Sequence, residues 1–152
     1  MENKEMGMNK EMALMVAEEM DFAGELTGEV QTQFCSMRAE TPEEKVTLFN
    51  ALNNANNKIR DNVNKELMIK DVYVEKVFCI DEKTGEKTCC PRTVLIDENG
   101  EGYTAVSIGV FSSLKKLFQI FGVPTWERPV CIVPKLVNKD SKSITTLSVK
   151  IK

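Results

Sequence analysis

The sequence contains no histidine, and this absence excludes several kinds of catalytic site at once. Histidine is the usual general acid and base near neutral pH and the commonest metal ligand in proteins. Sites in which a histidine activates a serine or cysteine nucleophile are therefore ruled out. The glycine-rich patterns GxxxxGK[ST] and GxGxxG, whose backbone cradles phosphates, are also missing. We expect a binding protein rather than an enzyme, without a cofactor.

The sequence also lacks long apolar runs. No stretch approaches the roughly 18 apolar residues that suggest a membrane-spanning helix. The N-terminal segment MENKEMGMNKEM has neither the basic start nor the apolar core of a secretory signal. A chain of 152 residues suits about one domain. These features predict a cytoplasmic protein with no membrane partner.

The five cysteines lack the CxxC spacing of a zinc site, and no histidine is present to complete one. Cys89 and Cys90 are adjacent, so in a strand they would point to opposite faces and could not easily hold one ion. The favoured interpretation is reduced cysteines that act as small apolar residues, with no metal site. A redox or metal-binding role stays open as the alternative.

Charge divides the chain into two parts. Residues 1–40 carry 3 basic and 9 acidic side chains, a net charge of −6, and residues 41–152 carry 17 and 14, a net charge of +3. Seven of the eight methionines fall in the first part. Three interpretations of this acidic, methionine-rich leader compete: a disordered tail, a helix packed on its own domain, and an arm that binds a partner. An acidic arm could also compete with nucleic acid for a basic groove.

A helix is predicted over residues 41–66. In the segment TPEE, Thr41 suits the N-cap, proline the first helical position, and Glu44 completes a capping box. Apolar residues then recur at helical spacing and predict a helix to about Asn64: Leu48, Leu52, Ala55, Ile59 and Val63. Seven asparagines between Asn50 and Asn64 lower its intrinsic stability. Their polar face is interpreted as solvated, with hydrogen bonding to base edges as the alternative.

From residue 67 the pattern changes to the alternation of strands. Five strands are predicted at 67–80, 88–96, 101–108, 130–137 and 143–151, with a helix at 109–122 between the third and fourth. Pro91 implies an edge or a bulge in the second strand. Asn99-Gly100 predicts a tight turn with positive φ. The helix carries an apolar stripe: Val110, Leu114, Leu117, Phe118 and Phe121.

The order of these elements predicts the fold class. A strand order β-β-β-α-β-β is typical of the OB-fold, a five-stranded barrel that binds oligonucleotides or oligosaccharides. We therefore expect an α+β to mostly β protein whose residues 67–152 form an OB-like barrel, preceded by one or two helices. A small α+β sheet with the same element order remains the alternative.

Strand alternation predicts a binding face. Val72 and Val74 would face the core and leave Tyr73 outside. The third strand would turn Tyr103 outward and three alternate side chains inward: Thr104, Val106 and Ile108. Single-stranded nucleic acid needs rings for base stacking and cations for phosphates. The candidates are the rings and cations of this face and its loops: Tyr73, Lys76, Lys83, Lys87, Arg92, Tyr103, Trp126, Arg128, Lys139 and Lys142. Each residue alone is more often structural. Trp126 is interpreted as a cap on the core, with a stacking platform beside Arg128 as the alternative.

Three segments carry a resemblance to a known family: TPEEKVTLFNA at 41–51, RTVLIDENGEGY at 92–103 and SIGVFSSLKKLFQIFGVPTWE at 107–127. Together they make residues 41–152 similar to small single-stranded DNA-binding proteins encoded by phages and mobile elements of Gram-positive bacteria. The resemblance implies an OB-like fold and a role in replication or transfer of the element's DNA. It does not extend clearly to residues 1–40.

The leading functional hypothesis is therefore sequence-tolerant binding of single-stranded DNA, which the protein would protect or present to replication proteins. RNA stays open as the ligand. A domain charge of only +3 predicts modest affinity for one barrel, so coating would need homo-oligomers or cooperativity. The alternative is a protein-interaction module, such as a phage-encoded inhibitor or adaptor, that docks through its methionine-rich leader.

Overall fold

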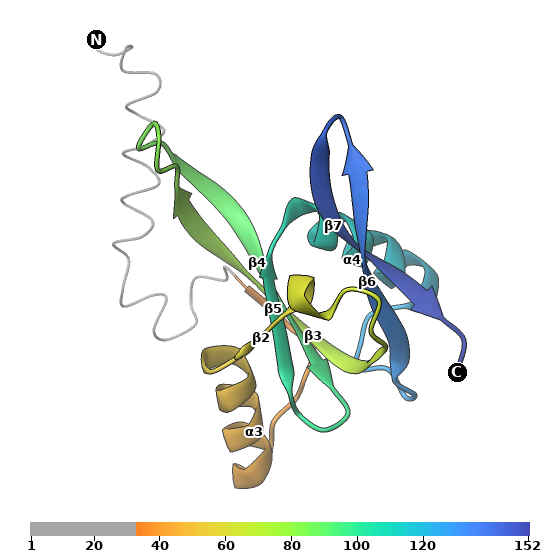
Figure 1. Cartoon of the computed structure of the whole chain (residues 1–152). Helices are drawn as coiled ribbons and strands as arrows, with labels where there is room; N and C mark the ends of the chain where they lie inside the picture. The colour runs from red at the N-terminus through yellow and green to blue at the C-terminus, as the bar shows by residue number, and fades with distance from the viewer. Residues whose placement is uncertain (1–32) are drawn as a thin grey trace. The chain divides into compact units, whose positions relative to one another are not determined.

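The computed structural model describes residues 33–152, which form a mostly β structure with a strongly curled, half-barrel sheet and two α-helices (Figure 1). The strands of this part are β1 (Gln33–Cys35), β2 (Asn57–Lys58), β3 (Leu67–Ile80), β4 (Lys87–Asp97), β5 (Gly102–Val106), β6 (Val130–Lys139) and β7 (Lys142–Lys150). The helices are α3 (Pro42–Asn53) and α4 (Ile108–Phe121), with a 3₁₀ turn, η1, at Ile59–Asn62.

The sheet is ordered β2-β5-β4-β3-β6-β7, and β1 pairs with β3 outside this path. Only β2 and β5 run parallel, and the other described pairs are antiparallel. The five long strands and α4 occur in the predicted order, with bounds close to those expected. The two short strands β1 and β2 were not predicted, so the described sheet has seven strands rather than five.

The start of α3 is as predicted, but its end is not. Thr41 accepts a hydrogen bond from the backbone N–H of Glu44, whose carboxylate accepts one from the backbone N–H of Thr41. The helix stops at Asn53 instead of continuing to about Asn64. Asparagine is a weak helix former, and the apolar Ile59 is fully buried in the sheet core instead of lying on a helix face.

The outer halves of β3 and β4 form a long hairpin arm. The two strands stay paired from Ile69 to Ile80, whereas β5 pairs with β4 only from Arg92 to Ile96. At Pro91, β4 therefore has one neighbour, and the missing N–H of proline is tolerated on its free edge. The prediction of an edge at Pro91 is confirmed. The β6–β7 hairpin projects in the same general direction as this arm (Figure 1).

Two apolar cores lie on opposite faces of the sheet. The larger core fills the concave face and includes the inward side of α4, through Val110, Leu114 and Leu117. The smaller core lies beneath α3 and consists of Ala51, Tyr73, Val94 and Ile96, with Met37, Leu48 and Leu52 packed against it. Helix α3 thus covers the face of the central strands that the sequence analysis expected to be open.

The predicted leader, residues 1–40, lies mostly outside the described residues, which begin at Gln33. Within residues 33–152, no helix is long and apolar enough to cross a membrane.

Candidate nucleic-acid interface

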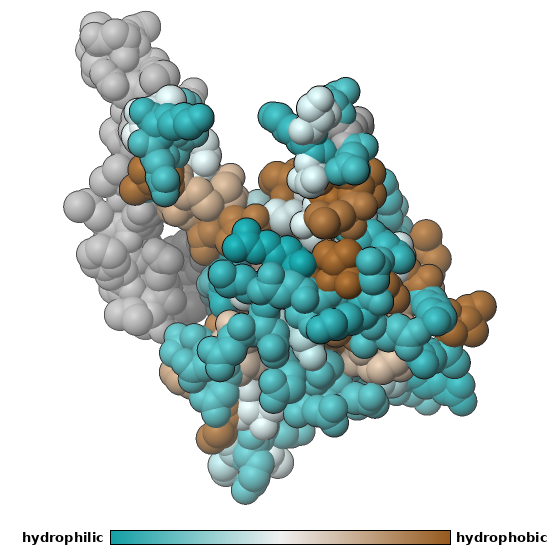
Figure 2. All heavy atoms as spheres, viewed as in Figure 1, coloured by the Kyte–Doolittle hydropathy of each residue, from teal (hydrophilic) through white to brown (hydrophobic). Residues whose placement is uncertain are grey.

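A groove of about 950 Å³ opens between β5 and β7. Strand β2 pairs with β5 only at two positions, and β7 pairs with β6, so the outer edge of β5 is left open near Val106. The groove is lined by residues from β2, η1, β4, β5, α4 and β7: Lys58, Arg60, Arg92, Thr104, Ala105, Val106, Ser107, Ile108, Gly109, Ser112, Ser143, Ile144 and Thr145. Figure 2 shows the two hairpins as separate lobes with an open notch between them.

The charge of the groove is of one sign. Three cations, Lys58, Arg60 and Arg92, line it, and none of its thirteen lining residues is acidic. Lys58 and Arg60 are exposed, and among the described residues neither makes a salt bridge. An unpaired cation beside a groove is free to neutralise a phosphate and release its counterion.

The start of α4 adds a second source of positive potential. Ser107 caps the helix by accepting a hydrogen bond from the backbone N–H of Val110 at 3.2 Å, and the first turn carries no acidic residue. The helix dipole places partial positive charge at this end. A Cβ on Gly109 would lie 2.3 Å from the carbonyl oxygen of Thr145. Glycine therefore lets β7 pack directly against the helix start and form one wall of the groove.

Apolar side chains supply the remaining surface of the groove. Val106 is 50% exposed and Ile108 is 66% exposed, while Ile144 is half-buried. Aliphatic side chains of this size can pack against the flat face of a base. The groove lining contains no aromatic residue, so ring stacking would have to come from a neighbouring element.

That element is the β3–β4 arm. The strand register places the side chains of Lys76, Phe78 and Lys87 on one face of the arm. This face continues the concave side of the sheet. The Nζ atoms of Lys76 and Lys87 lie 6.0 and 5.0 Å from the centroid of the Phe78 ring. A ring flanked by two ammonium groups is the combination that single-strand binding uses for stacking and phosphate contact.

The expected exposure of Tyr73 is wrong. Tyr73 lies on the face opposite Val72, as alternation predicted, but α3 covers that face and leaves Tyr73 only 7% exposed. Its hydroxyl donates a hydrogen bond of 2.9 Å to the Glu75 carboxylate. Burial and this carboxylate raise the pKa of Tyr73. The ring is a core residue without a face for a base.

Arg92 belongs both to the groove and to the region beneath α3. Its Nη1 donates to the Glu75 carboxylate at 2.9 Å, and its Nη2 donates to the backbone carbonyl of Leu52 at 2.8 Å. The second bond satisfies one of the carbonyls that the end of α3 leaves without an intrahelical partner. Arg92 therefore lines the groove, but its guanidinium is already engaged by the protein.

The predicted alternation of β5 has the wrong phase. Tyr103 and Ala105 pack against the larger core, whereas Val106, predicted to be inward, is exposed. Gly102 explains the difference, because a Cβ there would lie 2.4 Å from the carbonyl oxygen of Ala51 in α3. The face of Gly102 is therefore the one beneath α3, and Tyr103 turns into the concave core.

Trp126 caps the core, which confirms one of its two interpretations. It is 6% exposed, donates a hydrogen bond from its indole N–H to the Gly122 carbonyl at 3.0 Å, and packs edge-on against Phe118. Lys83, Arg128 and Lys142 are exposed and do not line the groove, and the side chain of Lys139 lies outside the described part.

The five cysteines are free thiols. The pKa of the Cys79 thiol, which lies on the β3–β4 arm, is raised mainly by a hydrogen bond with Cys90. Within residues 33–152, no group of three or more cysteine or carboxylate side chains is placed to hold a metal ion.

Three residues that line the groove were not predicted as site residues: Lys58, Arg60 and Ile108. The first two were assigned to an extended α3, and Ile108 was expected to face inward. The sequence gives little indication that these residues lie together, because the groove joins three segments that are far apart in the chain. The run of asparagines that ends α3 was the available sign that Lys58 and Arg60 lie outside the helix.

Known proteins match most of this chain. Residues 27–152 match the family described as phage single-stranded DNA-binding protein, a non-enzymatic class. A single-stranded DNA-binding protein of Bacillus phage GA-1 is 33% identical over 106 residues, which are 66% of this chain and 62% of that protein. The chain thus spans about three fifths of this relative's length. No solved structure matches the chain. The chain belongs to the phage single-stranded DNA-binding protein family.

Proposed function

We propose that this protein binds single-stranded DNA in a sequence-tolerant manner and acts in replication or transfer of phage DNA. Membership of the family supports this proposal. The structural observation that carries it is the groove between β5 and β7, which has three cations and no carboxylate among its lining residues. A polyanion is the ligand class that such a groove favours.

The strand would lie along the groove with its phosphates near Lys58, Arg60 and the start of α4. Its bases would pack on the exposed side chains of Val106 and Ile108. Bases that extend toward the β3–β4 arm would stack on Phe78. Serine and threonine hydroxyls make up much of the remaining lining, and they bond to any phosphate or sugar. This lining explains binding without strong sequence preference.

We further propose that the long strands form an OB-type barrel. Their order β5-β4-β3-β6-β7, with α4 between β5 and β6, supports this assignment. In such a barrel the ligand lies across the second and third strands and the flanking loops, which correspond here to β4, β5 and the two hairpin tips. The groove then occupies the seam at which the barrel is open.

Modest affinity is expected for a single chain, because the groove offers few cations. Useful coverage of DNA would need homo-oligomers or cooperative binding, and replication proteins would be the natural partners. No feature of the groove selects against the ribose hydroxyl, so RNA is a second ligand to be measured.

Anisotropy titrations of labelled oligo-dT, oligo-rU and a duplex test the proposal. Oligo-dT should bind more tightly than the duplex, with an affinity that falls steeply between about 50 and 200 mM salt. Lys58→Glu with Arg60→Glu should weaken oligo-dT binding roughly 10- to 100-fold and lower the salt slope by about 2. Lys45→Glu with Lys116→Glu, which changes net charge equally outside the groove, should have a much smaller effect. A folded groove variant that binds like the wild type would overturn the proposal.

A further inference from the structure

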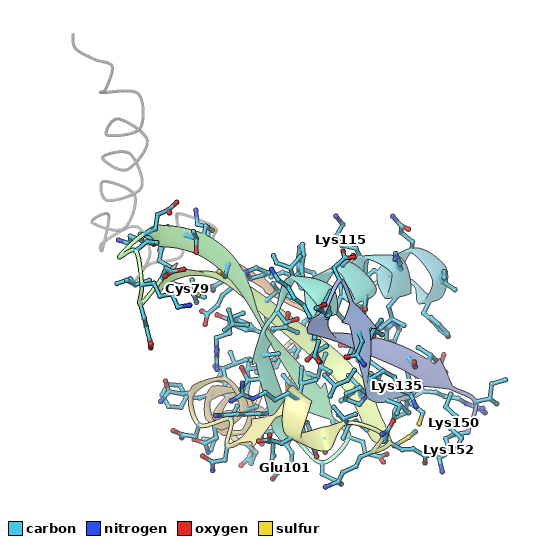
Figure 3. All side chains as sticks on the ribbon, turned by 45° about the horizontal axis from the view of Figure 1, so that its top comes forward. Cys79, Glu101, Lys115, Lys135, Lys150 and Lys152 are labelled. Carbon is cyan, nitrogen blue, oxygen red and sulfur yellow. The ribbon has the colours of Figure 1, made fainter. Side chains whose placement is uncertain are left out.

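A second, smaller cleft of about 340 Å³ adjoins the groove, between the end of α3 and the β4–β5 turn. It is lined by four asparagines together with alanine, glycine and one carboxylate: Asn50, Ala51, Asn54, Ala55, Asn56, Asn57, Gly100, Glu101 and Gly102. The carboxylate is that of Glu101, which Figure 3 labels. The cleft therefore differs in chemistry from the groove, which is cationic and has no amide side chain.

The amides of this cleft have unused hydrogen-bonding capacity. Each asparagine side chain offers two donors and a carbonyl acceptor. Within residues 33–152, these four side chains make two hydrogen bonds, from Asn54 to Asn50 at 3.4 Å and from Asn57 to Glu101 at 3.5 Å. Both distances are long for hydrogen bonds. Several amide donors and acceptors that line the cleft thus have no hydrogen-bond partner among the described residues.

The fold holds this cleft in place. The close contact of Gly102 with the Ala51 carbonyl fixes the end of α3 against the sheet, and Gly100, with φ +87°, forms the facing turn. Because α3 ends at Asn53, the next residues leave the helix and line the cleft instead of projecting around a helical surface. Asn50 stands on α3 and Asn57 on β2, and regular elements place side chains for recognition more precisely than a loop does.

The cleft and the groove meet at β2. Asn57 lines the cleft, and the next residue, Lys58, lines the groove. Consecutive Cα atoms are about 3.8 Å apart, but side chains of consecutive strand residues point to opposite faces, so one nucleic-acid strand would pass over the free edge of β2 to reach both openings. Strand β2 is hydrogen-bonded to β5 at both positions, which keeps the two openings in register.

The charge of Glu101 decides whether the phosphates or the bases of a DNA strand suit the cleft. A carboxylate repels phosphate but accepts hydrogen bonds from the exocyclic amino groups of bases. Asparagine amides pair with either donors or acceptors on a base edge. Thymine has no amino group, and its one free ring N–H lies between two carbonyls that a carboxylate repels, so it matches the carboxylate poorly. Cytosine offers an amino group next to an acceptor nitrogen and matches both partners.

We propose that this amide cleft is a base-binding subsite, which receives an unstacked base of the strand held in the groove and prefers amino-bearing bases to thymine. The proposal rests on the proposed DNA-binding function. It makes the protein mildly base-selective, although the groove itself is not.

The test compares labelled oligo-dC and oligo-dT of equal length with the full chain. The wild type should bind oligo-dC more tightly than oligo-dT. Asn50→Ala with Asn57→Ala should weaken oligo-dC binding roughly three- to tenfold, as expected for one or two lost base contacts, and oligo-dT binding less than about twofold. Asn53→Ala, an exposed asparagine of the same helix outside the cleft, is the matched control and should leave both affinities unchanged.

A second variant keeps the test decisive if the double variant does not fold. Glu101→Gln replaces an exposed side chain by an isosteric neutral one, and it should reduce the oligo-dC preference by improving oligo-dT binding. If the groove variant Lys58→Glu with Arg60→Glu loses DNA while both cleft variants retain the wild-type ratio, the subsite is refuted and the DNA groove stands. If no variant and no wild-type protein binds either oligonucleotide, the DNA-binding function itself fails.

Discussion

The face beneath α3 and the groove between β5 and β7 both carry cationic side chains, but these are bonded to the protein in the first region and exposed in the second. Beneath α3, the Tyr73 hydroxyl and the Arg92 guanidinium both bond to the Glu75 carboxylate. In the groove, Lys58 and Arg60 have no acidic partner among the described residues. Tyr73 and Arg92 are held by partners within the protein, whereas Lys58 and Arg60 are left without an acidic partner, so partners and burial rather than residue type distinguish the two regions.

Removal of the Tyr73 ring should have the largest effect on stability. Tyr73→Ala should lower the free energy of unfolding by about 3 kcal/mol, because a large buried side chain leaves a cavity. Tyr73→Phe should cost only about 1 kcal/mol, the value of one hydrogen bond. Urea unfolding measures both. A folded Tyr73→Phe protein that loses DNA affinity as strongly as the groove variant would show that this face contacts DNA.

Arg92→Lys separates the two regions at the residue that they share. Lysine keeps the positive charge but cannot bond to Glu75 and to the Leu52 carbonyl in the same forked geometry. We expect a loss of stability of about 1–2 kcal/mol. The affinity for oligo-dT should fall by less than about threefold, since the charge remains beside the groove. An intact stability combined with a large loss of affinity would instead assign the guanidinium to DNA.

Thr93 carries an unsatisfied hydroxyl within the buried strands. The Thr93 hydroxyl is fully buried and has no hydrogen-bond partner within the described residues. Thr93→Val keeps nearly the same shape without this unsatisfied group, so the free energy of unfolding should rise by about 1 kcal/mol. DNA affinity should not change. A decrease in stability would mean that the hydroxyl has a partner in solution.

The smallest effect on stability is expected at the exposed ion pairs that Glu66 forms outside both regions. Lys150 and Lys152 lower the pKa of Glu66 to about 2. A lowered pKa means that the pair stabilises the fold at neutral pH and that this contribution disappears as the pH falls from about 4 toward 2. Titration of the Glu66 carboxyl by NMR measures this pKa. Lys150→Gln with Lys152→Gln should return it to the ordinary range, and an unchanged value would exclude the ion pair as its cause.

Local signals in the sequence predicted much of the fold. The capping box at Thr41, the strand at Leu67–Ile80 and the stop of α4 at Gly122 depend on neighbouring residues, and all three appear where expected. The end of α3 was misplaced because Ile59 fits helical spacing by chance while its burial comes from the distant sheet.

The site was harder to predict because it depends on what covers each face. Alternation correctly separated Tyr73 from Val72, but it could not reveal that α3 covers the side of Tyr73. The groove also brings Arg60, Ile108 and Ile144 together, and their meeting depends on how strongly the sheet curls. Gly102 was the most informative overlooked residue, since its close approach to α3 sets the phase of β5.

Amide hydrogen exchange with and without oligo-dT locates the surface that contacts single-stranded DNA. If single-stranded DNA lies in the groove, protection should rise at residues 104–109 and 143–145, which line it. Exchange in the part of α3 that lies away from the amide cleft, at residues 44–49, should remain unchanged. Protection concentrated in α3 and absent from the groove would place the DNA on the face that we describe as closed and would contradict the account.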